Sequence, residues 1–325
     1  MRLFANANYD FISRRRIAYG ITAAFVAAGL VALLIRGFQY SVEFTGGTLA
    51  RIQTQEVLDV GELRNGLEAH GITGAEIQSF GSDREYVIRA RAAAEGADPN
   101  DTQATTEALT RAFDDVIGNG AYTVLKTDAM SPRVGSELRS RATLAVLLSF
   151  LVVLAYLAMR FEWRFGLAAI VATAHDIVGA LAFIALLRLE ISLFVVAALL
   201  SIVGYSLNDT IVIFDRVREN LPKSRNESFA AVLNRSVNET LPRTVLTGGT
   251  AIGSLTAMAI LGGDVVRPFA LIMLFGVVVG TFSSIFIAAP VLLAIETKWP
   301  GPHARGVRKA PPREPAAGRR TQPVA

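Results

Sequence analysis

The chain has 325 residues, 52% of them hydrophobic, and a mean hydropathy of +0.41. This composition is too apolar for a soluble chain of ordinary surface-to-volume ratio and indicates an integral membrane protein. The net charge is +4. Lys and Arg residues near the apolar segments set the orientation in the membrane and do not form a nucleic-acid footprint, so no specific nucleic-acid partner is expected. The absence of cysteine excludes disulfides, thiolate catalysis and cysteine-based metal sites, and no cofactor is expected.

The N-terminal segment, residues 1–16, is polar and ends in the cluster Arg14–Arg16. An apolar run over 17–35 follows and ends at Arg36, which predicts a first transmembrane helix over 17–36. A cleaved signal peptide is the alternative, but its apolar region usually has 7 to 15 residues. We therefore expect the N-terminus to stay on the cytoplasmic side.

Residues 37–141 have the composition of a globular domain. Alternating and helical spacings predict the order βαββαβ, which is the ferredoxin-like α+β pattern, a fold that hosts many functions. His70, at the end of the first of these helices, is expected to be a solvated side chain rather than a ligand. The predicted elements are strands at 48–54, 75–80, 85–91 and 121–127 and helices at 59–70 and 102–117.

Five further apolar runs, within residues 142–295, bring the number of predicted transmembrane helices to six. With a cytoplasmic N-terminus, the globular domain then lies in the periplasm and the C-terminus returns to the cytoplasm. Nineteen of the 32 Lys and Arg residues fall in the predicted cytoplasmic segments and two in the short outer loops, which supports this orientation in the bacterial inner membrane. The runs are 142–159, 165–187, 191–214, 244–261 and 269–295.

Two cytoplasmic segments have different characters. Residues 215–242 carry Phe229, Val232, Leu233 and Val237 at helical spacing, which favours an amphipathic helix on the membrane surface over a solvated loop. Residues 296–325 are rich in Pro, Gly and Arg without periodicity. We expect a disordered basic tail with loose attraction to anionic lipid or ribosomal RNA.

The most informative residue is Asp209, in the stretch Gly204–Thr210 within an otherwise apolar run. A central aspartate costs about 2.5 to 3.5 kcal/mol on insertion scales, so it is retained where it is paired, lines water or changes charge. Asp209 lies five residues before the end of its run, roughly 7 to 8 Å inside the cytoplasmic boundary. It is the leading candidate for a functional group.

Arg243 begins the fifth apolar run on the same side of the membrane. An arginine stem can span most of the depth to Asp209, so the two can pair if their helices are neighbours. Such a pair would keep the carboxylate ionised until a proton or a motion displaced the arginine.

A polar track is expected beside this pair. Thr247, Thr250 and Ser254 follow Arg243 on one helical stripe, where their hydroxyls could carry a water wire or simply bond their own backbone. The neighbours of Asp209, namely Tyr205, Ser206 and Asn208, are candidate members of the same track.

His175 and Asp176 lie near the centre of the third apolar run. Adjacent helical residues point about 100° apart, so we expect that they cannot pair with each other. Either can face the bundle interior as a second proton station. Two glycine pairs, Gly249/Gly253 and Gly276/Gly280, are expected only to let helices pack closely.

With these motifs the chain resembles the SecF family, whose members are the smaller subunits of the bacterial SecDF complex that assists the Sec translocon. The motifs extend over residues 9 to about 295, and Glu43 stands where the family pattern leads us to expect Asp. The matching stretches are Tyr9–Phe11 with Arg14–Arg15, Glu43–Thr48, Ala174–Asp176, Gly204–Thr210 and Arg243–Thr244.

The resemblance implies half of an RND-type bundle, with six helices that pair with SecD to complete a twelve-helix assembly. It also implies a proton-driven role, in which the complex acts with the SecYEG translocon on unfolded preproteins late in export. The family's key carboxylate and arginine correspond to Asp209 and Arg243.

The resulting hypothesis is that protonation of Asp209 releases Arg243 and shifts the helices beneath the periplasmic domain. Three alternatives are a small-molecule or lipid exporter of the RND superfamily, an intramembrane hydrolase and a purely structural scaffold of the translocon. An exporter would usually carry both halves on one chain. A hydrolase would need a second catalytic carboxylate or a Ser–His pair, and no such arrangement stands out.

Overall fold

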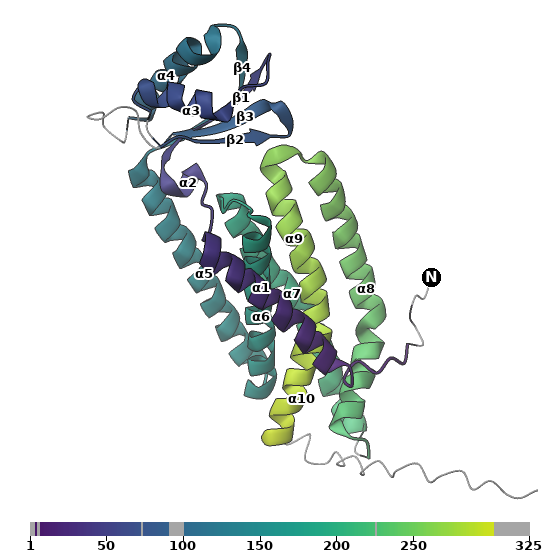
Figure 1. The fold of residues 1–325 in the computed structure, drawn as a ribbon. Coiled ribbons are helices and arrows are strands. Elements are labelled where there is room, and N and C mark those ends of the chain that lie inside the picture. Colours follow the sequence, from purple (N-terminus) through teal and green to yellow (C-terminus); the bar gives the residue numbers. More distant parts are fainter. Residues whose placement is uncertain (1–3, 5–6, 73, 91–100, 225, 302–325) are drawn as a thin grey trace, which may run out of the picture.

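The strand and helix patterns of residues 47–130 produce a small sheet domain at one end of a long helical bundle (Figure 1). The computed structural model describes residues 4, 7–72, 74–90, 101–224 and 226–301. Nearly all of the predicted C-terminal tail therefore lies outside the described residues.

The sheet has the strand order β2-β3-β1-β4, and every neighbouring pair is antiparallel. Two helices cover the face turned away from the bundle (Figure 1). This arrangement confirms the predicted ferredoxin-like βαββαβ domain. Its elements are β1 (Gly47–Thr54), α3 (Val60–Ala69), β2 (Glu76–Phe80), β3 (Ser82–Ala90), α4 (Thr102–Phe113), a π turn η1 (Asp114–Gly118) and β4 (Tyr122–Met130).

Local signals in the sequence fix the helix starts of this domain. The Asp59 carboxylate accepts hydrogen bonds from the first backbone N–H groups of α3, and Asp101 does the same for α4. Between the sheet and the helices lies a closed apolar core. His70, at the end of α3, is exposed as expected, and its Nε2 atom lies 3.3 Å from Asp115 Oδ2. The core includes Ile52, Leu67, Ile88, Leu109 and Phe113.

Six helical spans in the described residues are long and apolar enough to cross a bilayer, as predicted. Several exceed their apolar runs; α5, with 29 residues, is about 43 Å long, against a hydrocarbon core of about 30 Å. The helices are α1 (Arg15–Arg36), α5 (Pro132–Arg160), α6 (Trp163–Leu187), α7 (Leu193–Asn220), α8 (Phe229–Leu261) and α9 (Gly263–Ser283), the last continuing through a π turn η3 (Ser284–Ala288) into α10 (Ala289–Lys298).

The helical spacing predicted over 229–237 is confirmed, but the expected position of a separate helix on the membrane surface is wrong. Helix α7 continues to Asn220, a short turn η2 (Leu221–Lys223) follows, and α8 then runs unbroken from Phe229 into the membrane span. Val232, Leu233 and Val237 are fully buried in the core of the bundle. An apolar helical stripe does not distinguish contact with lipid from contact with protein, and here the contact is with protein.

Glycines set the closest contact between the central helices. A Cβ atom on Gly276 of α9 would lie 2.3 Å from Ile202 of α7, and one on Gly280 would lie 3.2 Å from Ser206. The second glycine pair therefore packs helices as expected. Gly249 and Gly253 of α8 instead face open space, with no other part of the described chain within 4 Å of a Cβ.

Candidate functional site

Asp209 lies on the inward face of α7 and is only 2% exposed. This face forms because Ile202, Ser206, Asp209 and Ile213 recur every three or four residues, and all four are buried. The Asp209 Oδ2 atom is buried and accepts no hydrogen bond. A carboxylate in this setting is poorly stabilised as an anion, so it is chemically suited to exchange a proton.

Arg243, on the neighbouring helix α8, carries the positive charge that acts on the Asp209 carboxylate. Its side chain is exposed in this chain, and no nitrogen–oxygen distance between the two residues is 4.0 Å or less. The helices are neighbours, as the pairing hypothesis required, but the ion pair is open.

Two hydroxyl groups beside Asp209, Tyr205 Oη and Thr281 Oγ1, are buried without a hydrogen-bond partner, as is Thr244 Oγ1 of α8. Gly248 provides room here, because a Cβ on it would lie 3.4 Å from Thr281 Oγ1 and 3.8 Å from Tyr205 Oη. Buried polar groups are nearly always hydrogen-bonded, so the Tyr205 and Thr281 hydroxyls are candidate partners for each other and for the Asp209 carboxylate.

Asp176 of α6 differs from Asp209 in that its carboxylate is hydrogen-bonded. It is 1% exposed and accepts hydrogen bonds from Ser206 Oγ and from Ser283 Oγ, the latter at 2.7 Å. Its carboxylate thus joins α6 to α7 and to the end of α9, one helical turn from Asp209. Both serine hydroxyls donate to Asp176 Oδ2, so this carboxylate holds three helices together.

The expectation that His175 and Asp176 cannot pair is wrong. The His175 Nδ1 atom lies 2.9 Å from Asp176 Oδ1. The Cα–Cβ bonds of adjacent residues do diverge, but the imidazole is long enough to turn back toward the neighbouring carboxylate. His175 Nε2 is buried without a partner, so the ring is held on one side only.

The structure gathers some members of the predicted track and separates others. Tyr205 and Ser206 lie beside the two aspartates, whereas Asn208 is exposed on the outer face of α7. Thr250 donates to the Thr247 carbonyl at 2.9 Å, and Ser254 donates to the Thr250 carbonyl at 3.1 Å. These hydroxyls follow the backbone-bonded alternative, and their stripe faces outward.

Three residues of the site were missed by the sequence reasoning: Ser283, Thr281 and Gly248. Each is a small residue in an apolar helix, and its relevance follows only from tertiary contacts. Ser283 has one local signal, since it directly precedes the π turn η3. Such turns inside α-helices are frequent at functional sites.

Glu43 connects the sheet domain to the helix that carries Asp209. Its Oε2 atom accepts a hydrogen bond from the backbone N–H of Leu193, at the start of α7, at 2.8 Å. It lies in the short helix α2 (Val42–Thr45), just before the Gly46–Gly47 pair. Glu43 therefore satisfies a free donor at the helix N-terminus, where negative charge is favoured.

Gly46 provides a second connection, to the start of α5. Its φ angle is +74°, and a Cβ there would lie 2.6 Å from the Cα of Pro132. Only glycine combines this backbone conformation with so close an approach. The segment 43–47 thus contacts α7 and α5 before it enters β1.

Arg89 of β3 makes a further contact between the domain and the bundle. It pairs at 2.5 Å with Glu190, in the loop between α6 and α7. Burial raises the pKa of Glu190 above its ordinary value, and the positive charge of Arg89 opposes that effect. The sheet is therefore attached at several points to the ends of α6 and α7.

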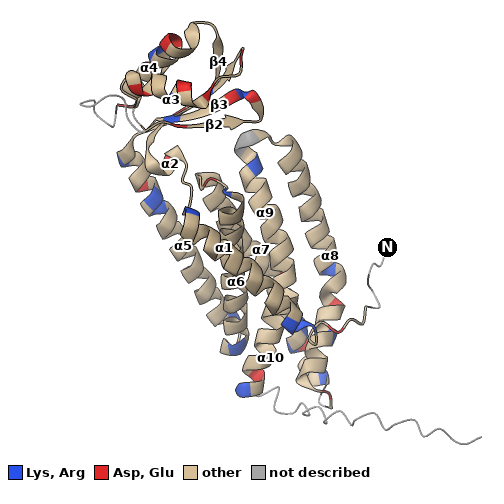
Figure 2. Cartoon of the chain, viewed as in Figure 1, with Lys and Arg blue, Asp and Glu red and all other residues tan. Residues whose placement is uncertain are grey.

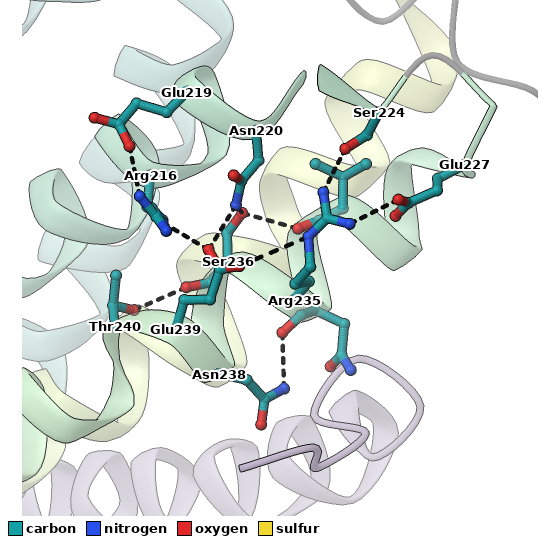
Figure 3. Close-up of polar contacts among 12 residues, drawn as sticks. Arg216, Glu219, Asn220, Ser224, Glu227, Arg235, Ser236, Asn238, Glu239 and Thr240 are labelled. Atoms are coloured by element: carbon teal, nitrogen blue, oxygen red, sulfur yellow. Dashed lines mark hydrogen bonds and ion pairs between the residues drawn. The ribbon is translucent and has the colours of Figure 1, made fainter. Parts of the chain in front are cut away.

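At the other end of α7, a polar network joins this helix to α8 (Figure 3). Arg216 pairs with Glu219 and Glu239, each at 2.6 Å. Asn220 is buried and donates to Ser236 Oγ at 3.0 Å and to Glu239 Oε2 at 2.8 Å. These charged and amide groups form one hydrogen-bonded network that connects the ends of the two helices.

Two asparagines of α8 hold the N-terminal segment. Asn234 Oδ1 accepts from Phe11 N at 2.9 Å, and Asn238 Oδ1 accepts from Tyr9 N at 2.8 Å. Both amide nitrogens donate to the Tyr9 carbonyl. The motif at 9–11 is thereby docked on the polar end of α8.

The described residues contain no cluster of His, Asp and Glu side chains that could hold a metal ion. The side chains gathered at the site are two carboxylates, several hydroxyls, His175 and Arg243. This set suits proton exchange and switching of an ion pair.

Comparisons with known proteins agree over most of the chain. The family model described as protein export membrane protein SecD/SecF, C-terminal, matches residues 111–298, and the SecD/SecF GG motif matches 31–56. Protein translocase subunit SecF of Gemmatimonas aurantiaca is 49% identical over 303 residues, covering 92% of this chain and 91% of that protein. SecF of Desulfurispirillum indicum is 38% identical over 306 residues, covering 93% and 96%.

Solved structures give a matching result. The chain is similar to SecDF, a translocon-associated membrane protein from Thermus thermophilus, with a TM-score of 0.78 and 36% identity. The match covers 91% of this chain and 40% of that one. A structure of SecDF in a super-membrane-facing form matches at 0.64, also with 36% identity, over 90% of this chain and 39% of that one.

Proposed function

The chain belongs to the SecD/SecF family of protein export membrane proteins and is similar to SecF over nearly its whole length, and on that basis we propose that it is a proton-driven subunit that promotes late export of preproteins. The observation that carries this proposal is Asp209, a buried carboxylate with an oxygen that no donor satisfies. It would work with SecD and the SecYEG translocon on unfolded preproteins.

The proposed step is a change of charge at Asp209. When Asp209 is ionised, Arg243 moves inward to pair with it; when Asp209 gains a proton, the attraction is lost and Arg243 returns outward. Each charge that crosses 100 mV supplies about 2.3 kcal/mol, enough to bias two arrangements separated by a few kcal/mol. The open pair and the unpartnered hydroxyls around it support this cycle.

Helix α7 would carry the change to the sheet domain. It is one continuous helix of 28 residues, with Asp209 in its interior and Glu43 bound at its first turn. Two SecDF structures, each 36% identical, match this chain with TM-scores of 0.78 and 0.64, and the second is described as a super-membrane-facing form. Both observations support a domain that moves relative to the bundle.

The face proposed to meet SecD lies on α7 and α8. Ser201, Gly204 and Asn208 form an exposed stripe on α7, and Gly249 and Gly253 are open on α8. Small and polar residues pack against other helices more readily than against lipid. Arg243 and Thr250 are exposed on α8 as well, so a partner here would also enclose the arginine.

Placement in the bacterial inner membrane, with cytoplasmic termini and a periplasmic sheet domain, is part of the same proposal. Its support is the distribution of Lys and Arg, which concentrate near the ends of the spans away from the sheet domain. Figure 2 displays these basic positions at the lower ends of the helices.

The decisive experiment replaces Asp209 by Asn in the complete complex and measures preprotein export in membrane vesicles with and without a proton gradient. We expect the gradient-dependent part of export to disappear, since an amide cannot exchange the proton. Asp215→Asn is the matched control, because Asp215 lies on the same helix with a side chain 42% exposed and should retain full export.

Co-purification of SecD with each variant separates this function from a scaffold role. Loss of gradient-dependent export with an intact complex supports the proton-driven subunit. Undiminished export by Asp209→Asn contradicts it, and failure of assembly together with export would assign Asp209 to the scaffold.

A further inference from the structure

A cavity of about 480 Å³ lies between the sheet domain and the bundle. Its walls come from the ends of α1 and α6, from α3, and from strands β2 and β3. None of the contacts assigned above to the proton cycle requires this space. The lining combines apolar side chains, such as Phe38 and Ile184, with four arginines.

The arginines give the cavity an excess of positive charge. Arg89 is neutralised by Glu190 at 2.5 Å and Glu76 at 3.6 Å. Arg36, Arg64 and Arg188 also line the cavity, and the part of the chain described contains no ion pair to any of them. Figure 2 shows basic positions on both sides of this junction.

Arg188 is held at the cavity by an unusual backbone conformation. It ends α6 in the left-handed region, with φ +52° and ψ +38°, where glycine is the usual residue. A residue with a side chain costs about 1 to 2 kcal/mol more than glycine in that conformation. An arginine in this position is strained, and such strain is typical of functional positions.

The cavity lies at the sheet-domain ends of the membrane-spanning helices α1 and α6, which is the level of the lipid headgroups. Arg36 is the last residue of α1, and Arg188 directly follows α6. The residues just before them face outward and are apolar: Leu34 and Ile35 are 80% and 75% exposed, and Leu187 is 55% exposed. Acyl chains can therefore lie on these helices while a headgroup enters the cavity.

From this geometry we infer that the cavity binds the phosphate headgroup of an anionic phospholipid from the leaflet on the sheet-domain side. Arg36, Arg64 and Arg188 donate charge-assisted hydrogen bonds to the phosphate, which arginine matches in shape. The lipid then becomes a further contact between domain and bundle, beside Glu43, Gly46 and Arg89. An exported polypeptide would not require the adjoining apolar surface of α1, which favours lipid as the occupant.

The test uses the purified full-length chain in detergent and native mass spectrometry. Phosphatidylglycerol and phosphatidylcholine with identical acyl chains are added at equal concentration, and the fraction of protein that retains each lipid is measured. We expect phosphatidylglycerol to be retained preferentially. The double variant Arg36→Gln/Arg188→Gln should lower that fraction about tenfold, as expected for the loss of two charge-assisted contacts.

Matched variants make the result specific. Arg84→Gln/Arg133→Gln removes the same charge from exposed arginines outside the cavity and should leave retention unchanged. Arg36→Lys/Arg188→Lys keeps the charge and should retain part of the binding. Thermal unfolding of each variant confirms that it is folded.

Four outcomes overturn the inference: equal retention of the two lipids, equal loss in both glutamine variants, no loss in the cavity variant, or displacement by another anion. Millimolar inorganic phosphate that displaced the lipid would assign the cavity to a free anion. An acidic peptide that displaced it would assign the cavity to exported polypeptide.

Discussion

The two buried aspartates differ in how their charges are satisfied. Asp176 receives hydrogen bonds from Ser206 and Ser283 and lies against His175, whereas an oxygen of Asp209 receives none. A fully bonded carboxylate stabilises the structure that surrounds it, and an incompletely bonded one is easier to protonate. We therefore propose a structural role for Asp176 and the exchanging role for Asp209.

This assignment predicts opposite effects on stability. Asp176→Asn should lower the free energy of unfolding by about 1.5 to 3 kcal/mol, because the Ser206 and Ser283 hydroxyls then donate to a neutral acceptor and an amide NH2 replaces the oxygen that faces His175 Nδ1. Asp209→Asn should leave stability unchanged or raise it, because it removes a poorly satisfied charge without changing the volume.

The measurement is thermal unfolding of the two variants in the same detergent, compared with the unmodified chain. A large destabilisation by Asp209→Asn, together with a neutral Asp176→Asn, would reverse the two roles. The Asp215→Asn variant controls for the loss of one negative charge from the bundle.

The sequence identifies the charged residues of the site but little of what surrounds them. Asp209, Asp176 and Arg243 stand out because charge within an apolar run is costly. Thr281 and Gly248 do not, since a threonine or a glycine in such a helix is ordinary and only the fold brings them beside the carboxylate. Whether the ion pair is open or closed depends on helix positions of a few ångströms, which residue spacing does not encode.

Helices α7 and α9 pack closely at Gly276. Gly276→Ala would place a methyl group 2.3 Å from Ile202, so the helices must separate or the isoleucine must move. We predict a loss of about 1 to 3 kcal/mol in unfolding free energy, as for other overpacked cores. Thermal unfolding tests this prediction.

A double-mutant cycle identifies the cause. Ile202→Ala removes the side-chain atoms that the new methyl group would meet and should restore part of the stability when combined with Gly276→Ala. Gly249→Ala is the matched control, because a Cβ there meets nothing within 4 Å. Additive losses in the double variant would show that the contact is not the cause.

The connection between α2 and α7 gives a second prediction for the elements. Glu43→Ala leaves the Leu193 N–H at the start of α7 without its acceptor and should cost about 0.5 to 2 kcal/mol. Glu43→Gln retains an acceptor oxygen and should lose less. If coupling passes through this contact, Glu43→Ala also reduces gradient-dependent export while SecD still co-purifies.

The number and order of elements follow from the sequence, but their lengths and partners follow less well. The βαββαβ order and the six spans are set by periodicity, capping residues such as Asp59 and long apolar runs. The sequence did not reveal that α8 continues from Phe229 to Leu261, because its polar first half reads as a separate surface helix. Burial against the bundle overrides that local pattern.

Considered as a whole, the molecule has two kinds of outer surface. The faces of α1 and α5 carry large apolar side chains, such as Leu34, Leu147 and Leu151, which suit contact with lipid. The stripe of Ser201, Gly204 and Asn208 on α7 is small and polar. We therefore propose that the partner lies on α7 and α8 rather than on α1 or α5.

The absence of cysteine makes this difference directly testable. Asn208→Cys on α7 is co-expressed with SecD variants that carry single cysteines along each of their helices. We expect an oxidant to cross-link it to SecD, since disulfide formation requires Cα atoms within about 7 Å. Leu148→Cys, on the outer face of α5 and 50% exposed, is the control and should form no cross-link.

The same experiment with a proton gradient tests whether the partner contact moves. If Asp209 switches the bundle, the cross-linking rate from Asn208→Cys changes when the gradient is imposed, because the two residues lie on one rigid helix, one position apart. The added substitution Asp209→Asn should abolish this change and leave the basal cross-link. A cross-link equally strong from Leu148→Cys, or a gradient effect that persists without the carboxylate, contradicts a partner face controlled by Asp209.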